Sequence, residues 1–262
     1  MEVTVVEATE SPERVVCQSA RGDYFDGYVG ETEFAELMRP VNFEEDDFEA
    51  VGGDLNEVDD PEEDLPYDDQ HIVEAKVRNF IHKELSRGHY GPFEHVQITL
   101  AVKGVSRTCM AQVTRHRHMT FDVQSQRYVD FSDKDTIVPK SLTEGQHLSR
   151  EEGVVEMDDD TREHLRQQYD SFTQEAFEQY QDMVEQGVPK EDARFILPLG
   201  TPVNMTMSGN ARTMMHVLNL RQTAASQWES RELAEKISEK LDEWALYTGE
   251  WWRDHGPVRN SP

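Results

Sequence analysis

Three segments of the chain alternate between apolar and polar residues, and each alternation predicts a β-strand. Residues 96–102 place valine, isoleucine and leucine at every second position, with polar or small residues between them. Residues 203–207 repeat the pattern with valine and methionine, and residues 1–6 repeat it with methionine and valine. A period of two is typical of a strand with one buried face, and the first segment is expected at a sheet edge.

Apolar residues elsewhere recur at helical spacing. The expected helices span residues 31–38, Asp69 to Gly88, 161–186, 210–220 and 230–247, with shorter ones capped by Ser106 and begun by Pro189. Strands mixed with separate groups of helices predict a fold of the α+β or α/β class.

An acidic segment interrupts this pattern. Fourteen acidic residues lie between Glu44 and Asp69, and no lysine or arginine occurs between Arg39 and Lys76. Such a composition buries little apolar surface, so a solvated insertion is expected at about residues 44–69. We therefore expect a single domain over residues 1–262 that carries this insertion.

The charge of the whole chain is strongly negative. Its 262 residues include 53 acidic and 26 basic ones, for a net charge of -27, and only eight of the basic residues are lysines. This composition is typical of proteins that stay hydrated in concentrated salt, where the Debye length falls to ~3 Å at 1 M and self-repulsion is screened. It predicts a halophilic protein and makes general electrostatic binding to nucleic acid improbable.

Cysteine content and hydropathy indicate the compartment. The two cysteines, Cys17 and Cys109, are far apart in sequence, and no apolar run is long enough to span a membrane. We expect a cytoplasmic protein that has no disulfide framework and does not bind a membrane.

Against the acidic background, the segment from Arg115 to Tyr128 is a cationic island. It holds three arginines, two histidines, one serine and two glutamines within fourteen residues. The planar guanidinium group matches phosphate oxygens in a bidentate manner, so we expect a site for phosphate-bearing ligands. The alternative is a solvated helix end with scattered ion pairs.

Four ordered motifs resemble those of the flavin-dependent thymidylate synthases, the ThyX family. Arg115-His116-Arg117 followed after seven residues by Ser125 is similar to the RHR-X7-S signature of that family. Similar segments occur at residues 89–95 (HYGPFEH), 194–198 (RFILP) and 210–221 (NARTMMHVLNLR).

The resemblance implies a fold and an activity. The fold would be α+β, with a central mixed or antiparallel sheet flanked by helices. The enzyme would methylate dUMP to dTMP, taking the carbon from methylenetetrahydrofolate and the hydride from FAD reduced by NADPH. It would use no cysteine nucleophile and would act as a homotetramer with shared active sites.

The resemblance also implies roles for individual residues. Arg221 would be the catalytic residue that activates the uracil ring electrostatically. The flavin-binding residues would be His89, Gly91, Arg115, His116, Arg117, Val123, Asn210, Arg212 and His216. The residues that bind dUMP would be Gln112, Arg115, Val123, Gln124, Ser125, Gln126, Arg127, Arg194 and Arg221. No metal ligand is implied.

Two positions depart from the family pattern. Gly91 stands where members often carry serine or threonine, and Val123 stands where they often carry glutamate or glutamine. Neither side chain donates or accepts a hydrogen bond, so only the backbone could bind a ligand at these positions.

Two other functions fit parts of the sequence. The first is a metal-dependent hydrolase whose ligands would come from His82, His89, His95, His116 and His118. The spacing of these histidines matches no familiar metal motif, and neighbouring arginines would repel a cation. The second is a nucleotide-binding module that keeps the pocket without the chemistry.

Overall fold

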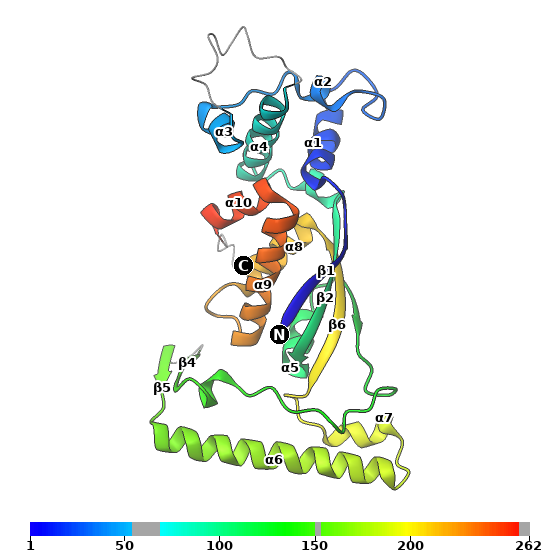
Figure 1. The fold of residues 1–262 in the computed structure, drawn as a ribbon, viewed down its shortest axis with the longest axis vertical. Coiled ribbons are helices and arrows are strands. Elements are labelled where there is room, and N and C mark those ends of the chain that lie inside the picture. Colours follow the sequence, from blue (N-terminus) through cyan, green and yellow to red (C-terminus); the bar gives the residue numbers. More distant parts are fainter. Residues whose placement is uncertain (54–68, 150–152, 257–262) are drawn as a thin grey trace. The chain divides into compact units, whose positions relative to one another are not determined.

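A computed structural model describes residues 1–53, 69–149 and 153–256 of the chain (Figure 1). The described chain divides into two compact units. Unit 1 comprises residues 1–6, 99–208 and 220–236, and unit 2 comprises residues 7–98, 209–219 and 237–262. The expected single domain stays a prediction.

A four-stranded sheet has the order β1-β2-β6-β3, and β1, β2 and β6 lie side by side in Figure 1. The strands span Glu2–Ala8 (β1), Gln97–Ser106 (β2), Thr120–Val123 (β3) and Pro202–Asn210 (β6). The three strands expected from alternation are present, and β1 lies at an edge as predicted. The sheet with its separate helices confirms the α+β fold. Strand β3 was not expected, because four residues are too few to show a period.

Strand β3 places the end of the cationic island on the sheet. It runs antiparallel to β6 and pairs Thr120 with Ser208 and Val123 with Met205. The backbone N–H of Gln124 continues this contact by donating to the carbonyl of Asn204 at 2.8 Å. The loop after β3 therefore starts from a fixed position.

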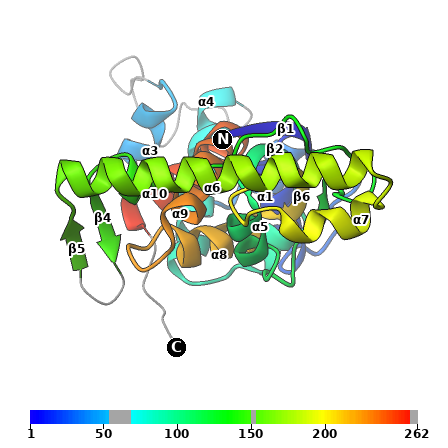
Figure 2. The ribbon, with the colours of Figure 1, turned by 90° about the horizontal axis from the view of Figure 1, so that it is seen from below.

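Unit 1 also contains a long helix with a hairpin at one end and a short helix at the other (Figure 2). The long helix α6 spans Asp159–Glu185, as predicted, and α7 spans Lys190–Ala193 with Pro189 as its N-cap. The hairpin pairs β4 (Gln146–Ser149) with β5 (Gly153–Glu156) and was not expected. Two 3-10 turns, Lys140–Leu142 and Arg194–Ile196, contact α6.

The apolar stripe of α6 is only partly buried, contrary to the sequence expectation. Phe177 and Tyr180 are buried in the C-terminal half of the helix, whereas Phe172 is 73% exposed and Leu165 is 37% exposed. Periodicity identifies the helix correctly but does not show which turns of its stripe have a neighbour within the chain.

The start of helix α9 is joined to the start of helix α5 in unit 1. Helix α5 spans Arg107–Val113, and its N-cap Ser106 accepts a hydrogen bond from the N–H of Cys109 at 2.9 Å, as predicted. Buried Glu229, at the start of α9 (Trp228–Trp244), accepts from the N–H of Ser106 at 2.6 Å and from its hydroxyl. These two hydrogen bonds hold the start of α5, the helix that leads into the cationic island.

The helices of unit 2 pack around α4. Helix α4 (Gln70–Ser86) begins at its N-cap Asp69, as expected, and contacts α1 (Pro12–Gly22), α2 (Phe34–Met38), α3 (Glu45–Ala50) and α10 (Leu246–His255). Helix α2 lies within the predicted residues 31–38. Helix α1 was not expected.

Part of the acidic segment is structured, and the expectation of an insertion at about residues 44–69 stays a prediction. Helix α3 carries a capping box between Glu44 and Asp47, and its Phe48 is only 3% exposed. Asp47 is buried as well, and a charge-assisted hydrogen bond from Arg78 of α4 at 2.5 Å compensates for its burial. Residues 54–68 of the predicted insertion lie outside the described residues.

Two predicted element boundaries were wrong. Strand β6 continues through Gly209 to Asn210, and helix α8 (Ala211–Arg221) follows directly. The helix expected over residues 230–247 is two helices, because the backbone of Ala245 leaves helical geometry between α9 and α10. Apolar spacing continues across that break, so the pattern alone does not reveal it.

The structure also describes the cysteines and the hydropathy of the helices. Both Cys17 and Cys109 are buried and free. In the ranges that the structure describes, no helix is long and apolar enough to cross a membrane.

Candidate functional site

The cationic island begins in a tight turn after helix α5, and this turn orients its first three residues. The N–H of His116 donates to the carbonyl of Val113 at 3.1 Å, and the N–H of Met119 donates to the carbonyl of His116 at 3.2 Å. His116 is buried at 7% exposure, whereas Arg115 and Arg117 on either side are exposed. The two arginines are therefore available to anionic ligands and the histidine is directed inward.

Arg221, the last residue of α8, is held against this turn. Its Nε donates to Nε2 of His116 at 2.9 Å, and its Nη2 donates to the backbone carbonyl of Gln112 at 3.0 Å. Burial, followed by the positive charge of Arg115, lowers the pKa of Arg221. The site thus concentrates positive charge where an anionic ligand would relieve the repulsion.

The loop after β3 carries the other predicted nucleotide-binding residues, and several of their polar groups already have partners. The hydroxyl of Ser125 accepts from the N–H of Arg127 at 3.2 Å. Arg127 donates to Glu191 at 2.8 Å, and Gln124 Oε1 accepts from the N–H of Asn204 at 3.3 Å. These contacts give the loop a defined shape before any ligand binds.

Gln126 differs from its neighbours in this loop. Its side chain is buried, and its Nε2 has no hydrogen-bond partner within the described part of the chain. A buried donor without an acceptor costs roughly 1–3 kcal/mol. Unpaired donors of this kind are often found where a ligand supplies the missing acceptor.

The structure adds one cation that sequence reasoning missed. Arg107 opens helix α5, and its pKa is lowered by burial and by the positive charge of Arg194. Two guanidinium groups are thus near enough in unit 1 to repel each other. Arg194 itself is partly buried, and its Nε donates to the carbonyl of Glu191 at 3.0 Å. The sequence did contain a clue to this residue, because Arg107 directly follows Ser106, the predicted N-cap of the helix that leads to the cationic island.

Val123 is the last residue of β3, and its side chain is partly exposed. It is paired with Met205 across the sheet. An apolar side chain here offers a ligand no hydrogen bond, so only backbone atoms of Val123 could provide one.

In unit 2, His89 follows helix α4 and is oriented by a carboxylate. Its Nδ1 contacts Glu84, a residue in the last turn of α4 whose own side chain is buried. Gly91, two residues later, begins a short 3-10 turn (Gly91–Glu94), and the space where a Cβ would stand is open. Both predicted positions are exposed.

The start of α8 holds the remaining predicted flavin-binding residues of unit 2. The side-chain oxygen of Asn210 accepts from the N–H of Thr213 at 2.8 Å, so this residue caps the helix. Arg212 and His216 are exposed, one turn apart, and Arg212 forms an ion pair with Glu94 of the 3-10 turn. The exposed ion pair is weak and can exchange for an anionic ligand.

Both cysteine side chains are buried. Burial raises the pKa of Cys109 to about 12, and the negative charge of Glu229 adds to this effect. Burial also raises the pKa of Cys17 well above its usual value. Because the thiolate is the reactive form, burial disfavours reaction at either thiol.

The histidines of the metal-dependent alternative have separate partners. His82 contacts the carbonyl of Tyr247, His89 contacts Glu84, and His116 contacts Arg221. Among the described residues, no group of three or more histidine, cysteine, aspartate or glutamate side chains could hold a metal ion.

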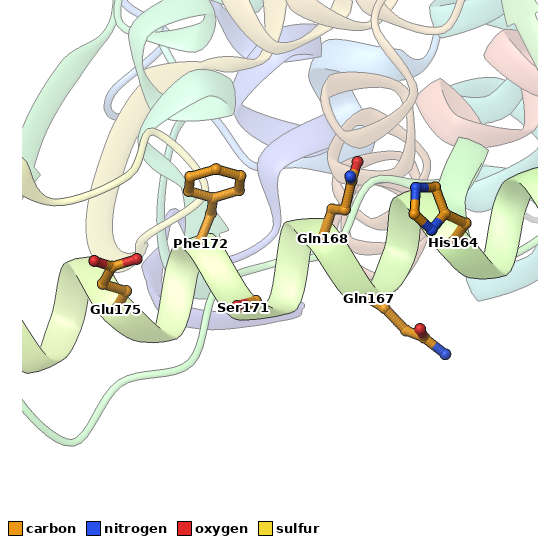
Figure 3. Close-up of a pocket in the computed structure, with 6 residues that line it drawn as sticks. All are labelled: His164, Gln167, Gln168, Ser171, Phe172 and Glu175. Carbon is orange, nitrogen blue, oxygen red and sulfur yellow. The ribbon is translucent and has the colours of Figure 1, made fainter.

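A recess lies along helix α6, away from the predicted residues. It is lined by side chains of this one helix, which are His164, Gln167, Gln168, Ser171, Phe172 and Glu175 (Figure 3). Phe172, Gln168 and His164 extend from the same side of the helix in the close-up, and Gln167 extends from the other. The recess contains none of the residues expected to bind ligands.

Comparison with known proteins gives matches along nearly the whole chain. A profile of the family described as thymidylate synthase complementing protein matches residues 4–245. The flavin-dependent thymidylate synthase of Halobacterium salinarum is 39% identical over 261 residues, which cover 96% of this chain and 95% of that protein. The flavin-dependent thymidylate synthase of Haloarcula marismortui is 40% identical, with the same coverage.

A solved structure is similar to this chain in its fold. The UMP/dUMP methylase PolB from Streptomyces cacaoi, bound with 5-Br dUMP, superposes with a TM-score of 0.73 and 20% identity. The superposition covers 98% of this chain and 96% of that one. The two proteins therefore share their fold.

Proposed function

The chain belongs to the family of flavin-dependent thymidylate synthases, and we propose that it methylates dUMP to dTMP. In this proposal methylenetetrahydrofolate supplies the carbon, and FAD reduced by NADPH supplies the hydride. The observation that carries the proposal is the half-buried guanidinium of Arg221, held by His116 and Gln112 beside the cationic island.

Arg221 is proposed to bind the uracil ring of dUMP. Its Nε and one Nη2 hydrogen are used within the protein, and three N–H donors remain for a ligand. Donors aimed at the N3–O edge of uracil favour negative charge there and polarise the ring toward attack at its double bond. The lowered pKa of Arg221 supports this role, because desolvation and repulsion from Arg115 are both relieved by a bound anion.

Arg107 and Arg194 are proposed to bind the phosphate of dUMP. Burial and then the positive charge of Arg194 lower the pKa of Arg107, so a bound anion would relieve the repulsion between the two arginines, and forked guanidinium groups match phosphate oxygens. Gln112, Ser125, Gln126 and Arg127 are proposed to complete this site. The unpaired Nε2 of Gln126 supports the assignment, because a ligand oxygen would supply the acceptor that this buried donor lacks.

The residues present fit FAD, because its diphosphate is anionic and several arginines are exposed. When bound, FAD would supply the hydride for the reaction. Arg115 and Arg117 are exposed on the turn after α5, and Arg212 is exposed at the start of α8. We propose that Arg115, Arg117 and the backbone near Val123 hold flavin in unit 1, with the two arginines on its diphosphate. In unit 2, Arg212, Asn210, His216 and the backbone near Gly91 are proposed to hold flavin as well. His89, oriented by Glu84, is proposed to lie beside the flavin ring.

The reaction is proposed to proceed without an enzyme cysteine. The raised pKa values of Cys109 and Cys17 support this, because neither thiol yields a nucleophile near neutral pH. The remaining proposals are a cytoplasmic homotetramer with shared active sites and a protein adapted to concentrated salt. The net charge of -27 supports the last of these.

Two measurements test the proposed function. The purified protein should show the absorbance of bound flavin in the visible spectrum. It should also form dTMP from dUMP only when methylenetetrahydrofolate and a reduced nicotinamide are both supplied. A protein that binds flavin but forms no dTMP under these conditions would contradict the proposal.

A further inference from the structure

Helix α4 ends in a turn that carries His89. The N–H of His89 donates to the carbonyl of Glu84 at 2.9 Å, and the N–H of Gly88 donates to the carbonyl of Leu85 at 3.0 Å. Gly88 has a φ of 74°, in the left-handed region. Two such hydrogen bonds around a left-handed glycine form the Schellman motif, which here fixes the backbone of the histidine that follows the glycine.

The side chain of Glu84 holds the same histidine. In a Schellman motif, an apolar contact frequently joins the residue after the glycine to the last turns of the helix. Here the carboxylate of Glu84 contacts Nδ1 of His89 instead. Glu84 therefore binds His89 at two points, through its backbone carbonyl and through its side chain, and the second contact restricts rotation of the imidazole.

The contact also determines which ring nitrogen of His89 is left for a ligand. An ionised carboxylate only accepts hydrogen bonds, so the nitrogen that contacts Glu84, Nδ1, carries a proton. Nε2 is the ring nitrogen that Glu84 does not engage. The side chain of His89 is 45% exposed, whereas that of Glu84 is 8% exposed. The imidazole thus reaches the surface of unit 2, and the carboxylate that orients it is buried.

We propose that Glu84 is a positioning residue for the flavin site, which holds the imidazole of His89 so that Nε2 faces the bound flavin. This inference rests on the proposed function, which places His89 beside the flavin ring. It adds to that site a residue that lies outside the four family motifs, because Glu84 precedes the motif at residues 89–95.

A carboxylate at this place has a second possible role, which is to stabilise the end of α4 and nothing more. In that case, removing it would lower the free energy of unfolding and leave the affinity for FAD unchanged. If Glu84 acts through His89, its removal would weaken FAD binding only while the imidazole is present. The two roles therefore predict different results.

A double-mutant cycle separates these roles. The variants are Glu84→Leu, Glu84→Gln, His89→Ala and the double variant Glu84→Leu/His89→Ala. Leucine supplies the apolar contact that is frequent in this motif, and glutamine keeps an oxygen that accepts from Nδ1. Arg87→Ala is the matched control, because Arg87 pairs with the same carboxylate at 3.6 Å but its side chain is 70% exposed.

Two readouts are needed for each variant. The dissociation constant of FAD is obtained from the fluorescence of FAD that is released when the holoenzyme is diluted. Thermal unfolding establishes that the variant is folded.

The expected result is a loss of affinity that depends on His89. Glu84→Leu should weaken FAD binding by about tenfold, because an unrestrained imidazole has to be ordered when the flavin binds. Glu84→Gln and Arg87→Ala should stay within about twofold of the wild type, since glutamine keeps the acceptor and an exposed ion pair contributes little. In the His89→Ala background, the leucine substitution should change the affinity by less than about twofold.

Either of two results would overturn the inference. One is a folded Glu84→Leu variant that binds FAD as tightly as the wild type. The other is an equal loss of affinity with and without the imidazole of His89. If Glu84→Leu does not fold, Glu84→Asp decides, because its shorter side chain keeps the charge but falls short of the ring, and wild-type affinity in that variant would also overturn the inference. A wild-type protein that binds no FAD would instead contradict the proposed function.

Discussion

At the scale of single residues, the candidate site combines side chains that already have hydrogen-bond partners in the protein with side chains that keep unused donors. Ser125, Gln124 and Arg127 are occupied by contacts within the loop after β3. By contrast, Arg221 keeps unused donors and Gln126 keeps an unpaired one. We infer that these two side chains give up least when dUMP binds, because they exchange no internal hydrogen bond for it.

Arg107 offers a test of phosphate binding. Arg107→Ala should weaken binding of dUMP by roughly 10- to 100-fold, the loss of a bidentate charged contact. Binding of deoxyuridine, which lacks the phosphate, should change by less than about twofold. Both dissociation constants are measured by titration of the flavin-loaded enzyme. Arg162→Ala on α6 serves as a control for loss of one positive charge. If Arg107→Ala weakened the binding of dUMP and of deoxyuridine equally, Arg107 would not bind the phosphate.

The buried thiols test the absence of a cysteine nucleophile. The variants Cys17→Ala and Cys109→Ala should each form dTMP at a rate within about threefold of the wild type, since neither thiol ionises near neutral pH. Cys109→Ala should also lower the free energy of unfolding by ~1 kcal/mol, because it leaves a small cavity. Abolished turnover in a folded Cys109→Ala variant would contradict the proposed mechanism.

At the scale of elements, a carboxylate of α1 holds the start of α10. Glu13 Oε1 accepts from the N–H of Thr248 at 2.7 Å, in the first turn of α10, whose N-cap Ala245 has no side-chain hydrogen bond. Burial raises the pKa of Glu13 from 4.5 to about 7, and the nearby charge of Glu74 adds to the shift. The contact therefore depends on pH in the range where many enzymes work.

The sign of that dependence follows from the direction of the shift. Because the folded protein binds the Glu13 proton more tightly than the unfolded chain, the free energy of unfolding should fall as the pH rises from 4.5 to 7. The contribution is on the order of 1–3 kcal/mol. Urea unfolding of the wild type and of Glu13→Gln, both at pH 5 and pH 8, isolates it. An equal pH dependence in the two proteins would show that Glu13 is not responsible.

Elements with a long, regular pattern could be predicted from the sequence, and elements fixed by tertiary contacts could not. The strands β2 and β6 and the helices α4 and α6 have many repeats of their period. Strand β3 and helix α3 have four to six residues, and their positions depend on pairing with Met205 and on packing of Phe48. The break at Ala245 leaves no trace in the spacing of apolar residues.

The same distinction applies to the candidate site. Motif resemblance identifies residues that are close in sequence, including the triplet at Arg115 and the loop at Ser125. It does not show that His116 faces inward, which depends on the turn after α5, or that Arg107 lies near Arg194. Such proximity between distant segments is a property of the folded chain.

At the scale of the whole molecule, the negative charge predicts a dependence on salt. The chain carries a net charge of -27, and its self-repulsion is screened as the Debye length shortens from ~10 Å at 0.1 M to ~3 Å at 1 M. The midpoint of thermal unfolding should therefore rise by several degrees between 0.2 and 2 M KCl. Neutralising the exposed acids Asp160, Glu178 and Glu185 of α6 to amides should reduce this rise. A midpoint that falls with KCl would contradict the salt adaptation.

The central claim is that this chain transfers a one-carbon unit to dUMP with the hydride of a flavin. A single-turnover experiment tests it most directly. The flavin-loaded enzyme is reduced under anaerobic conditions, freed of nicotinamide, and mixed with dUMP and methylenetetrahydrofolate. We predict that dTMP forms in an amount equal to the reduced flavin, with the flavin absorbance returning at the same rate. Reoxidation without dTMP, or dTMP formed by enzyme whose flavin stays reduced, would contradict the account.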